Sequence, residues 1–237
     1  MPNPYFQFKK FTVMHNRCAM KVGTDGVLLG AWATPPGNGA ILDVGTGSGL
    51  IALMLAQKCN ANITGIEIDL QAVEQARENV KQSPWRNRIR IEHSTFQKHV
   101  DNTSNKYDMV ITNPPYFTNS INAPDLNRTN ARHQTELTME GLFAGVKKVL
   151  KPQGRFSMIH PVENEPELLL LASVSSLYPC EIMYVQPTPQ LPPKRILMNF
   201  WMKKVPLKSE TLTIESGKRH NYTEQYKKLT KDYYLAF

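Results

Sequence analysis

The sequence has few cysteines and no long apolar run, and both shortages exclude classes of protein. Cys18, Cys59 and Cys180 are odd in number and form no CxxC pair, which argues against a zinc site or a disulfide framework and for a reducing compartment. No apolar stretch approaches membrane length, and the amino terminus lacks the uninterrupted apolar core of a signal peptide. We therefore expect a cytoplasmic protein that uses neither membrane nor metal.

Acidic residues are also scarce relative to basic ones. The chain carries 28 Lys and Arg against 20 Asp and Glu, a formal net charge of +8. Such an excess favours a polyanionic partner, although a basic surface that only keeps the protein in solution explains the charge equally well. The length of 237 residues fits one domain with a well-buried core.

The most informative stretch is Asn113-Pro114-Pro115-Tyr116, which directly follows the apolar run 107–112. The pattern predicts a buried strand that presents Asn113 at its carboxyl end, where open parallel sheets bind ligands. The Asn113 side-chain oxygen and the Pro114 carbonyl can each accept one N–H of an amino group on a conjugated carbon, which localises the nitrogen lone pair. The prolines stiffen the segment, and Tyr116 offers a face for stacking. The tetrapeptide therefore predicts alkylation of such a nitrogen, while its Asn-Pro and Pro-Pro pairs also occur in ordinary turns.

A second motif lies in residues 41–53, which predict a short strand, a glycine-rich turn and a helix. Gly45, Gly47 and Gly49 allow tight backbone geometry and the close approach of a ligand, and the new helix contributes free N–H groups. The spacing is GxGxG after the acidic Asp43, unlike the GxGxxG of nicotinamide binders. The motif therefore points away from a dinucleotide.

Residues 63–68 predict a second strand that ends near Glu67, followed by a helix that Asp69 caps. A carboxylate at this strand end can accept hydrogen bonds from both ribose hydroxyls of a nucleoside. Nearer the amino terminus, Thr24 or Asp25 is expected to cap a short helix, whose start could hold an anion.

These motifs, LDVGTGSG, GIEID and NPPY in this order, resemble those of class I S-adenosylmethionine-dependent methyltransferases. The resemblance implies a Rossmann-like α/β fold, with a mostly parallel seven-stranded sheet, an antiparallel terminal hairpin and helices on both faces. It also implies that the Gly45–Gly49 loop cradles the methionine part of the cofactor, that Asp43 orders the loop and the cofactor amino group, and that Glu67 holds the ribose. Thr95 would flank the adenine, where many relatives carry Asp.

The amino-terminal run FTVMHNRCAMKVGTDGVLLGAWA resembles a narrower family, the bacterial enzymes that methylate N6 of adenine 37 in a valine tRNA. This resemblance extends over most of the chain. It implies that Thr24 and Asp25 lie beside the methionine end of the cofactor and that Arg17 and Lys21 border the RNA entrance. We expect the enzyme to act as a monomer.

Three alternatives stay open. Relatives that methylate glutamine in release factors carry a helical domain ahead of the glycine loop, yet only about 40 residues precede it here. Relatives that modify ribosomal RNA or DNA share NPPY, and the DNA enzymes usually add a recognition domain. A catalytically silent RNA-binding factor on the same scaffold is a rival of another class.

The later chain predicts further elements and basic residues that could contact RNA. The polar segment 117–133 is expected to close over the substrate base, which makes Arg128 and Arg132 candidate RNA contacts. A proline-rich loop ends in Lys194 and Arg195, which could grip phosphate. Helices are predicted over 138–150 and over 165–177, where the leucines favour the core, and strands over 155–159, 180–186 and 196–202.

We divide the predicted single domain, residues 1–237, into three parts. Residues 1–39 form a segment at the cofactor entrance, residues 40–160 form the cofactor-binding core with NPPY, and residues 161–237 complete the sheet.

Overall fold

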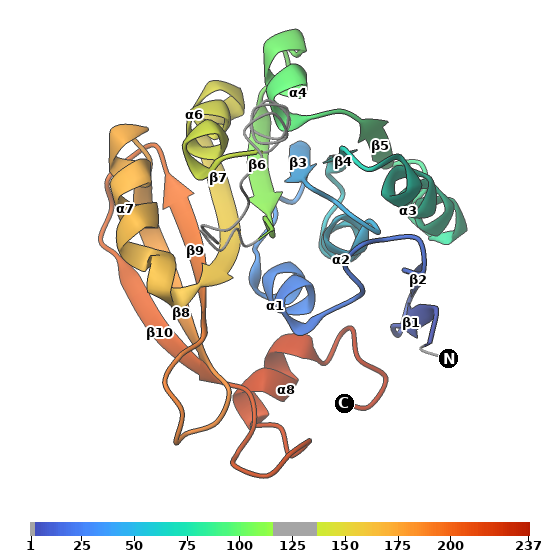
Figure 1. The fold of residues 1–237 in the computed structure, drawn as a ribbon, viewed down its shortest axis with the longest axis vertical. Coiled ribbons are helices and arrows are strands. Elements are labelled where there is room, and N and C mark those ends of the chain that lie inside the picture. The colour runs from blue at the N-terminus through green and yellow to red at the C-terminus, as the bar shows by residue number, and fades with distance from the viewer. Residues whose placement is uncertain (1–2, 116–136) are drawn as a thin grey trace, which may run out of the picture.

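A computed structural model of the chain describes residues 3–115 and 137–237. In these residues an eight-stranded sheet has the order β10-β8-β9-β7-β6-β3-β4-β5, and β1 and β2 form a separate two-stranded sheet (Figure 1). The strands are β1 (Tyr5–Gln7), β2 (Thr12–Met14), β3 (Ala40–Val44), β4 (Asn62–Glu67), β5 (Ile89–His93), β6 (Tyr107–Thr112), β7 (Leu150–Pro161), β8 (Tyr178–Gln186), β9 (Arg195–Trp201) and β10 (Lys208–Thr213). The helices are α1 (Thr24–Trp32), α2 (Leu50–Lys58), α3 (Leu70–Gln82), α4 (Phe96–Asn102), α6 (Met139–Val149), the short 3-10 helix η1 (Val162–Asn164), α7 (Glu165–Val174) and α8 (Glu224–Thr230).

Helices cover both faces of the sheet, with α1, α2 and α3 on one side and α4, α6 and α7 on the other (Figure 1). Successive residues of a strand point to opposite faces, so each strand supplies both cores. In β3, for example, Ile41 joins the core beneath α1 and α2, whereas Leu42 joins the core beneath α6. Central strands such as β3, β6 and β9 are apolar on both faces because the sheet is buried on both sides there.

The strand pairing confirms the predicted α/β architecture. β3 pairs in parallel with β4 and β6, and β6 pairs in parallel with β7, whereas β9 runs antiparallel to both β7 and β8. The expected number of seven strands is one too few, because β10 adds an edge strand parallel to β8. Its sequence, KSETLT, is polar and mostly exposed, so the apolar pattern used to predict strands does not reveal it.

Two of the predicted helix caps differ in outcome. Asp69 caps α3 as expected, since its carboxylate accepts from the Ala72 amide at 2.8 Å. The prediction that Thr24 or Asp25 caps α1 is wrong, because Gly23 is the N-cap residue and gives no side-chain hydrogen bond. Asp25 lies in the first turn, and its carboxylate accepts a hydrogen bond from Arg195.

The leucine-rich helix α7 is less buried than its sequence suggests. Leu168 and Ala172 are buried, but Leu170 and Val174 are 64% and 77% exposed. The expectation that its leucines favour the core therefore holds for one face only. A helix that covers a single sheet near its edge has only one face to bury.

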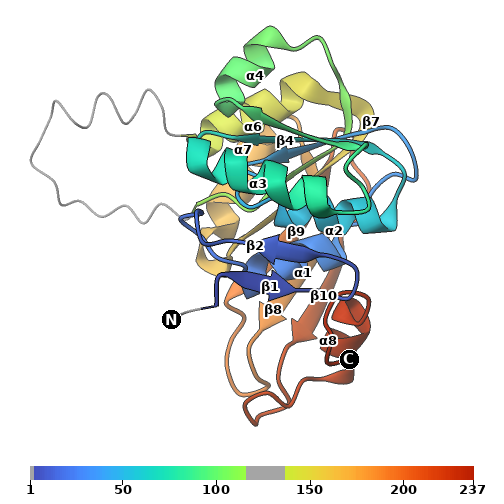
Figure 2. The same cartoon turned by 90° about the vertical axis from the view of Figure 1, so that its right-hand side faces the viewer.

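The β1–β2 hairpin and the carboxyl-terminal segment both pack against the α1 side of the fold. Figure 2 shows the β1–β2 hairpin beside α1, with α8 and the carboxyl terminus below it. Val13, Tyr226 and Tyr233 join the same core as the α1 residue Leu29. This core draws on residues from all three parts of the chain defined above, and the division itself stays a prediction.

Candidate active site

The ends of β3 and β6 bring the two sequence motifs together. Val44 pairs with Thr112 across the two parallel strands, and the Thr112 hydroxyl donates to the Val44 carbonyl at 2.8 Å. The residues that follow them, Gly45 and Asn113, both line one cavity. The site therefore lies at the carboxyl ends of parallel strands, as expected for an open α/β sheet.

This cavity has a volume of about 350 Å³ and is formed by three segments of the chain. One is the segment before and at the start of α1, the second is the glycine-rich turn with the first residues of α2, and the third is Asn113. The predicted site residues that line it are Lys21, Thr24, Asp25, Gly45, Gly47 and Asn113. Pro114 is buried and Pro115 is exposed, while Tyr116 lies outside the described residues.

The three glycines of the turn serve two purposes. All three have a left-handed backbone conformation, with φ of 69° at Gly45, 54° at Gly47 and 81° at Gly49. Residues with a side chain rarely adopt this conformation. A Cβ on Gly45 or Gly47 would meet no described atom within 4 Å, whereas one on Gly49 would lie 3.5 Å from the Ala76 Cβ. The first two glycines thus leave open space at the turn, and the third allows α3 to pack against it.

Asp43 holds the turn from inside the core. Its side chain is fully buried, and Oδ2 accepts from the Thr46 hydroxyl at 2.6 Å. Burial raises the pKa of Asp43 to about 7, although the Thr46 hydroxyl and the Ala52 amide act to lower it. Since Asp43 is not among the cavity-lining residues, its contact in this structure is with the loop.

Glu67 is tied to the same turn from the end of β4. One carboxylate oxygen accepts from the Gly47 amide at 2.9 Å, and the other accepts from the amides of Ile68 and Asp69 at 2.8 and 3.1 Å. Thr95 lies on this side of the site, because the neighbouring Ser94 amide donates to the Glu67 carbonyl. Its hydroxyl caps α4 by accepting from the Lys98 amide at 3.1 Å.

The predicted RNA contacts are placed differently from one another. Lys21 lines the cavity, and Lys194 is exposed. Arg17 forms ion pairs with Glu74 and Glu78 on α3. Arg195 Nε donates to the Asp25 carboxylate at 2.8 Å, so it joins a predicted cofactor residue. Arg128, Arg132 and the rest of the segment 117–133 lie outside the described residues. The expectation that this segment closes over the substrate base therefore stays a prediction.

Sequence reasoning missed two residues of the site. Met20 lines the cavity and is 58% exposed, but nothing in its surroundings marks it in the sequence. Asn79 is 1% exposed and connects the site to β2, since it exchanges two hydrogen bonds with the Met14 backbone and donates to the carbonyl of the cavity-lining Ser48 at 2.9 Å. A polar residue within the apolar face of α3 was a signal that could have identified Asn79.

In the part of the chain that the structure describes, no group of three or more His, Cys, Asp or Glu side chains could hold a metal ion. Nor does any helix of this part have the length and apolarity needed to cross a membrane.

Comparison with known proteins identifies relatives that match almost the whole chain. The methyltransferase small domain family matches residues 18–177. A Bacteroides fragilis protein named tRNA1(Val) (adenine(37)-N6)-methyltransferase is 47% identical over 99% of both chains, and a Trichodesmium erythraeum protein of the same name is 43% identical over 98% of both. Among solved structures, a predicted O-methyltransferase from Agrobacterium tumefaciens aligns with a TM-score of 0.68 at 19% identity, covering 88% of this chain and 96% of that one. The structural match concerns the fold alone.

Proposed function

Because the chain belongs to the methyltransferase small domain family and to the tRNA1(Val) (adenine(37)-N6)-methyltransferases, we propose that it methylates N6 of adenine 37 in valine tRNA, with S-adenosylmethionine as methyl donor. The structural observation that carries the proposed methyl transfer to an amino group is the position of Asn113. It lines the same cavity as Gly45 and Gly47, so an acceptor amino group and a cofactor can meet there. Relatives with this name match the chain from end to end.

The residues around the cavity fit S-adenosylmethionine, which supplies an electrophilic methyl group on a positively charged sulfur when bound. Gly45 and Gly47 leave open space for the methionine part, and Thr24 and Asp25 line the wall beside them. We assign the ribose hydroxyls to Glu67, whose carboxylate already accepts three backbone N–H groups at this edge of the sheet. Thr95 lies beyond Glu67, and we place it near the adenine.

Asn113 and the residues after it act on the acceptor base. The Asn113 side-chain oxygen and the Pro114 carbonyl each accept one N–H of the adenine amino group, which localises the nitrogen lone pair and stabilises the positive charge that develops on alkylation. The buried Pro114 fixes the backbone that presents these acceptors. A base in a stem-loop must leave its stack to reach this position, and Tyr116 is the residue we assign to stack on it.

The substrate assignment rests on the full-length relatives rather than on the motif. NPPY also suits glutamine in release factors and amino groups in ribosomal RNA or DNA. A relative that shares 47% of its residues over 99% of the chain favours tRNA over these alternatives, and the net charge of +8 suits a polyanionic substrate. An intact turn with Gly45 and Gly47 beside Asn113 favours an enzyme over a silent RNA-binding factor. We further propose that one chain acts as a monomer in the cytoplasm.

The test is transfer of labelled methyl from S-adenosylmethionine, with unmodified tRNA, ribosomal RNA, duplex DNA and release factor assayed in parallel. We expect label in N6-methyladenosine of valine tRNA. In Asn113→Ala, kcat should fall by about 10²- to 10³-fold, because one oriented polar group is lost, while S-adenosylmethionine affinity changes little. Asn102→Ala, at an exposed position of α4, is the matched control and should keep full activity. Label found only in protein glutamine would overturn the RNA substrate and retain the cofactor.

A further inference from the structure

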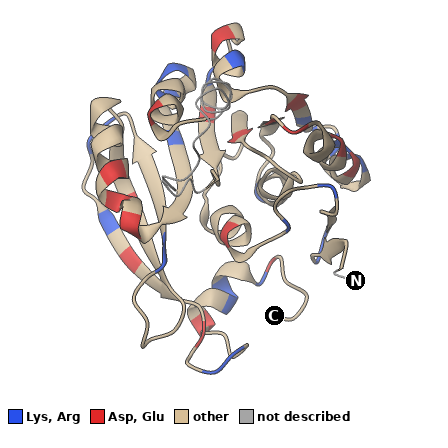
Figure 3. Cartoon of the chain, viewed as in Figure 1, with Lys and Arg blue, Asp and Glu red and all other residues tan. Residues whose placement is uncertain are grey.

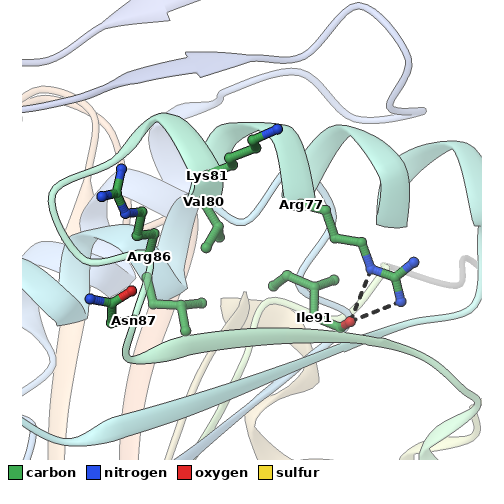
Figure 4. A pocket seen from close by; sticks show the side chains of 7 residues that line it. Arg77, Val80, Lys81, Arg86, Asn87 and Ile91 are labelled. Carbon is green, nitrogen blue, oxygen red and sulfur yellow. Dashed lines mark hydrogen bonds between the residues drawn. The ribbon is translucent and has the colours of Figure 1, made fainter.

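A second hollow of the molecule lies between α3 and the edge strand β5, separate from the cavity that holds Asn113 (Figure 4). Its volume is about 320 Å³. We call it the α3–β5 groove and define it by its seven lining residues: Arg77, Val80, Lys81, Arg86, Asn87, Ile89 and Ile91. Val80, Ile89 and Ile91 give it an apolar floor, and the other four give it a polar rim.

Every charged side chain that lines the α3–β5 groove is a cation. Arg77 is held in place, since its Nε and one terminal nitrogen donate to the Ile91 carbonyl at 3.2 and 3.0 Å (Figure 4). Lys81 and Arg86 are exposed on the rim, with the Asn87 amide beside them. Three cations around one hollow attract an anion strongly, and Arg side chains suit phosphate in particular.

The acidic residues of the two elements that form the groove, α3 and β5, pair with side chains that do not line it. Figure 3 shows both signs of charge along α3. The acids of this helix, Glu74 and Glu78, pair with Arg17 of the amino-terminal segment. On β5, Glu92 pairs with Arg90 at 3.1 Å and with His99 at 3.3 Å. The positive potential of the rim is therefore not cancelled by a carboxylate that lines it.

We propose that the α3–β5 groove binds the phosphodiester backbone of the tRNA substrate, with phosphates at the cationic rim and ribose against the apolar floor. This inference rests on the proposed function. The net charge and the rim both suit RNA, and phosphate contacts commonly fix the position of a nucleic acid without reading its sequence.

The position of the groove lets one RNA reach both sites. Arg77, the lining residue of α3 nearest to the active site, lies seven residues from Leu70, which is about 10 Å at 1.5 Å per residue, and Lys81 lies eleven residues, or about 16 Å, from Leu70. Helix α3 begins three residues after Glu67, the last residue of β4. In β5, Ile91 lies two residues before His93, the partner of Glu67 in the sheet. The groove thus extends outward from the Glu67 side of the active site.

The opposite face of the sheet is a poorer surface for RNA. There, Figure 3 shows acidic residues along α7. Glu163 lies in η1, and Glu165 and Glu167 lie in the first turn of α7. Like charges repel phosphate, so we expect the tRNA to approach from the α3 side.

The test removes two charges from the groove and two from a matched position elsewhere. Lys81→Gln/Arg86→Gln takes one cation from the last turn of α3 and one from the loop after it. Lys147→Gln/Lys148→Gln takes two cations from the last turn of α6, on the opposite face, and changes the net charge equally. For each variant we would measure tRNA affinity between about 50 and 200 mM salt, S-adenosylmethionine affinity, and the kcat and KM of tRNA methylation.

In the groove variant we expect the tRNA dissociation constant and KM to rise about tenfold. The plot of log affinity against log salt concentration should become shallower, with the magnitude of its slope reduced by about 1.5 to 2, because two phosphate contacts are lost. S-adenosylmethionine affinity and kcat should stay near wild type. If the double variant is unstable, Arg86→Gln alone replaces it, because Arg86 lies outside any helix. This single variant should also raise the tRNA dissociation constant, by a smaller factor.

Equal tRNA affinity in the groove and control variants would overturn the groove as an RNA site. That result is distinct from a failure of the proposed function, which would show as a wild-type protein that transfers no methyl to tRNA. The binding comparison tests the groove in either case, since tRNA affinity does not depend on turnover.

Discussion

Arg195 Nε lies 2.8 Å from the Asp25 carboxylate, and this ion pair joins the first turn of α1 to the start of β9 at the wall of the cavity proposed to bind the cofactor. Both side chains are partly exposed, at 32% and 25%. From the sequence, Arg195 is expected to contact RNA and Asp25 to contact the cofactor. Their contact indicates that Arg195 orients Asp25.

Arg195→Met should therefore weaken S-adenosylmethionine binding, since the Asp25 carboxylate would lose the guanidinium that holds it at 2.8 Å. A partly exposed pair is worth about 1 kcal/mol or less, so we expect the dissociation constant to rise about three- to fivefold. Arg195→Lys should show a smaller rise. Equilibrium titration with cofactor measures both, and Lys151→Met breaks the ion pair with Asp108, also 2.8 Å long, as a control. An unchanged cofactor affinity combined with weakened tRNA binding would restore the assignment of Arg195 to RNA.

Glu67→Gln should weaken S-adenosylmethionine binding more strongly. The wild-type carboxylate accepts three backbone N–H groups and is proposed to accept from ribose hydroxyls, whereas a glutamine amide offers one accepting oxygen and no charge. Hydrogen bonds to charged groups are worth about 1.5–3 kcal/mol, so we expect a loss of tenfold or more in affinity. As a control, Glu140→Gln, in the exposed first turn of α6, should leave S-adenosylmethionine affinity unchanged. Wild-type affinity in Glu67→Gln would assign the ribose to another residue.

The elements that the sequence predicts well are those specified by nearby residues. Asp69 caps α3 because its carboxylate reaches an amide three residues away, and the turn at Gly45 needs only glycines at short spacing. The pair of Asp25 and Arg195 joins residues 170 positions apart, so no local pattern reveals it. Because this distant partner engages the Asp25 side chain, the sequence alone does not show that Gly23, rather than Thr24 or Asp25, is the N-cap residue of α1.

Burial on one face of an element is equally hard to predict. The run of leucines in α7 is apolar all round, and only the position of the helix decides that Leu168 is buried while Leu170 is exposed. The polar edge strand β10 is recognised through its pairing with β8. The α3–β5 groove combines Arg77 and Lys81 on one helix with Arg86 from the loop beyond it, a combination that is visible only after folding.

Asn79→Leu should destabilise the protein and loosen the cofactor site. The leucine has a similar shape but leaves the Met14 amide, the Met14 carbonyl and the Ser48 carbonyl without the bonds that Asn79 gives them. Unpaired buried groups cost about 1–3 kcal/mol each, and partial relaxation should limit the total loss to about 2–4 kcal/mol. Urea unfolding measures this, and cofactor affinity should fall because Ser48 and the segment after Met14 line the site. Asn102→Leu, on the exposed side of α4, is the control, and equal stability of the two variants would contradict the bridging role of Asn79.

Asp43 predicts an unusual dependence of stability on pH. Burial raises its pKa from 3.8 to about 7 in the folded protein, so between these values the folded state holds a proton that the unfolded state has lost. The contribution of this group to stability is therefore fully present below pH 3.8 and is lost as pH rises towards 7. From pH 5 to 7 the free energy of unfolding should fall by about 1.4 kcal/mol per pH unit, or by about 2–3 kcal/mol in total.

The measurement is urea unfolding of the wild type and of Asp43→Asn at pH 5, 6, 7 and 8. The variant should lack the loss between pH 5 and 7, because asparagine does not titrate. Asp108→Asn provides the matched control. Burial acts to raise the pKa of Asp108, but the Lys151 ammonium and the Ala40 amide outweigh it and lower the pKa, so this group is ionised in both states throughout the range. Parallel curves for wild type and Asp43→Asn would mean that Asp43 keeps its charge in the core, with the Thr46 hydroxyl and the Ala52 amide compensating fully for the loss of water.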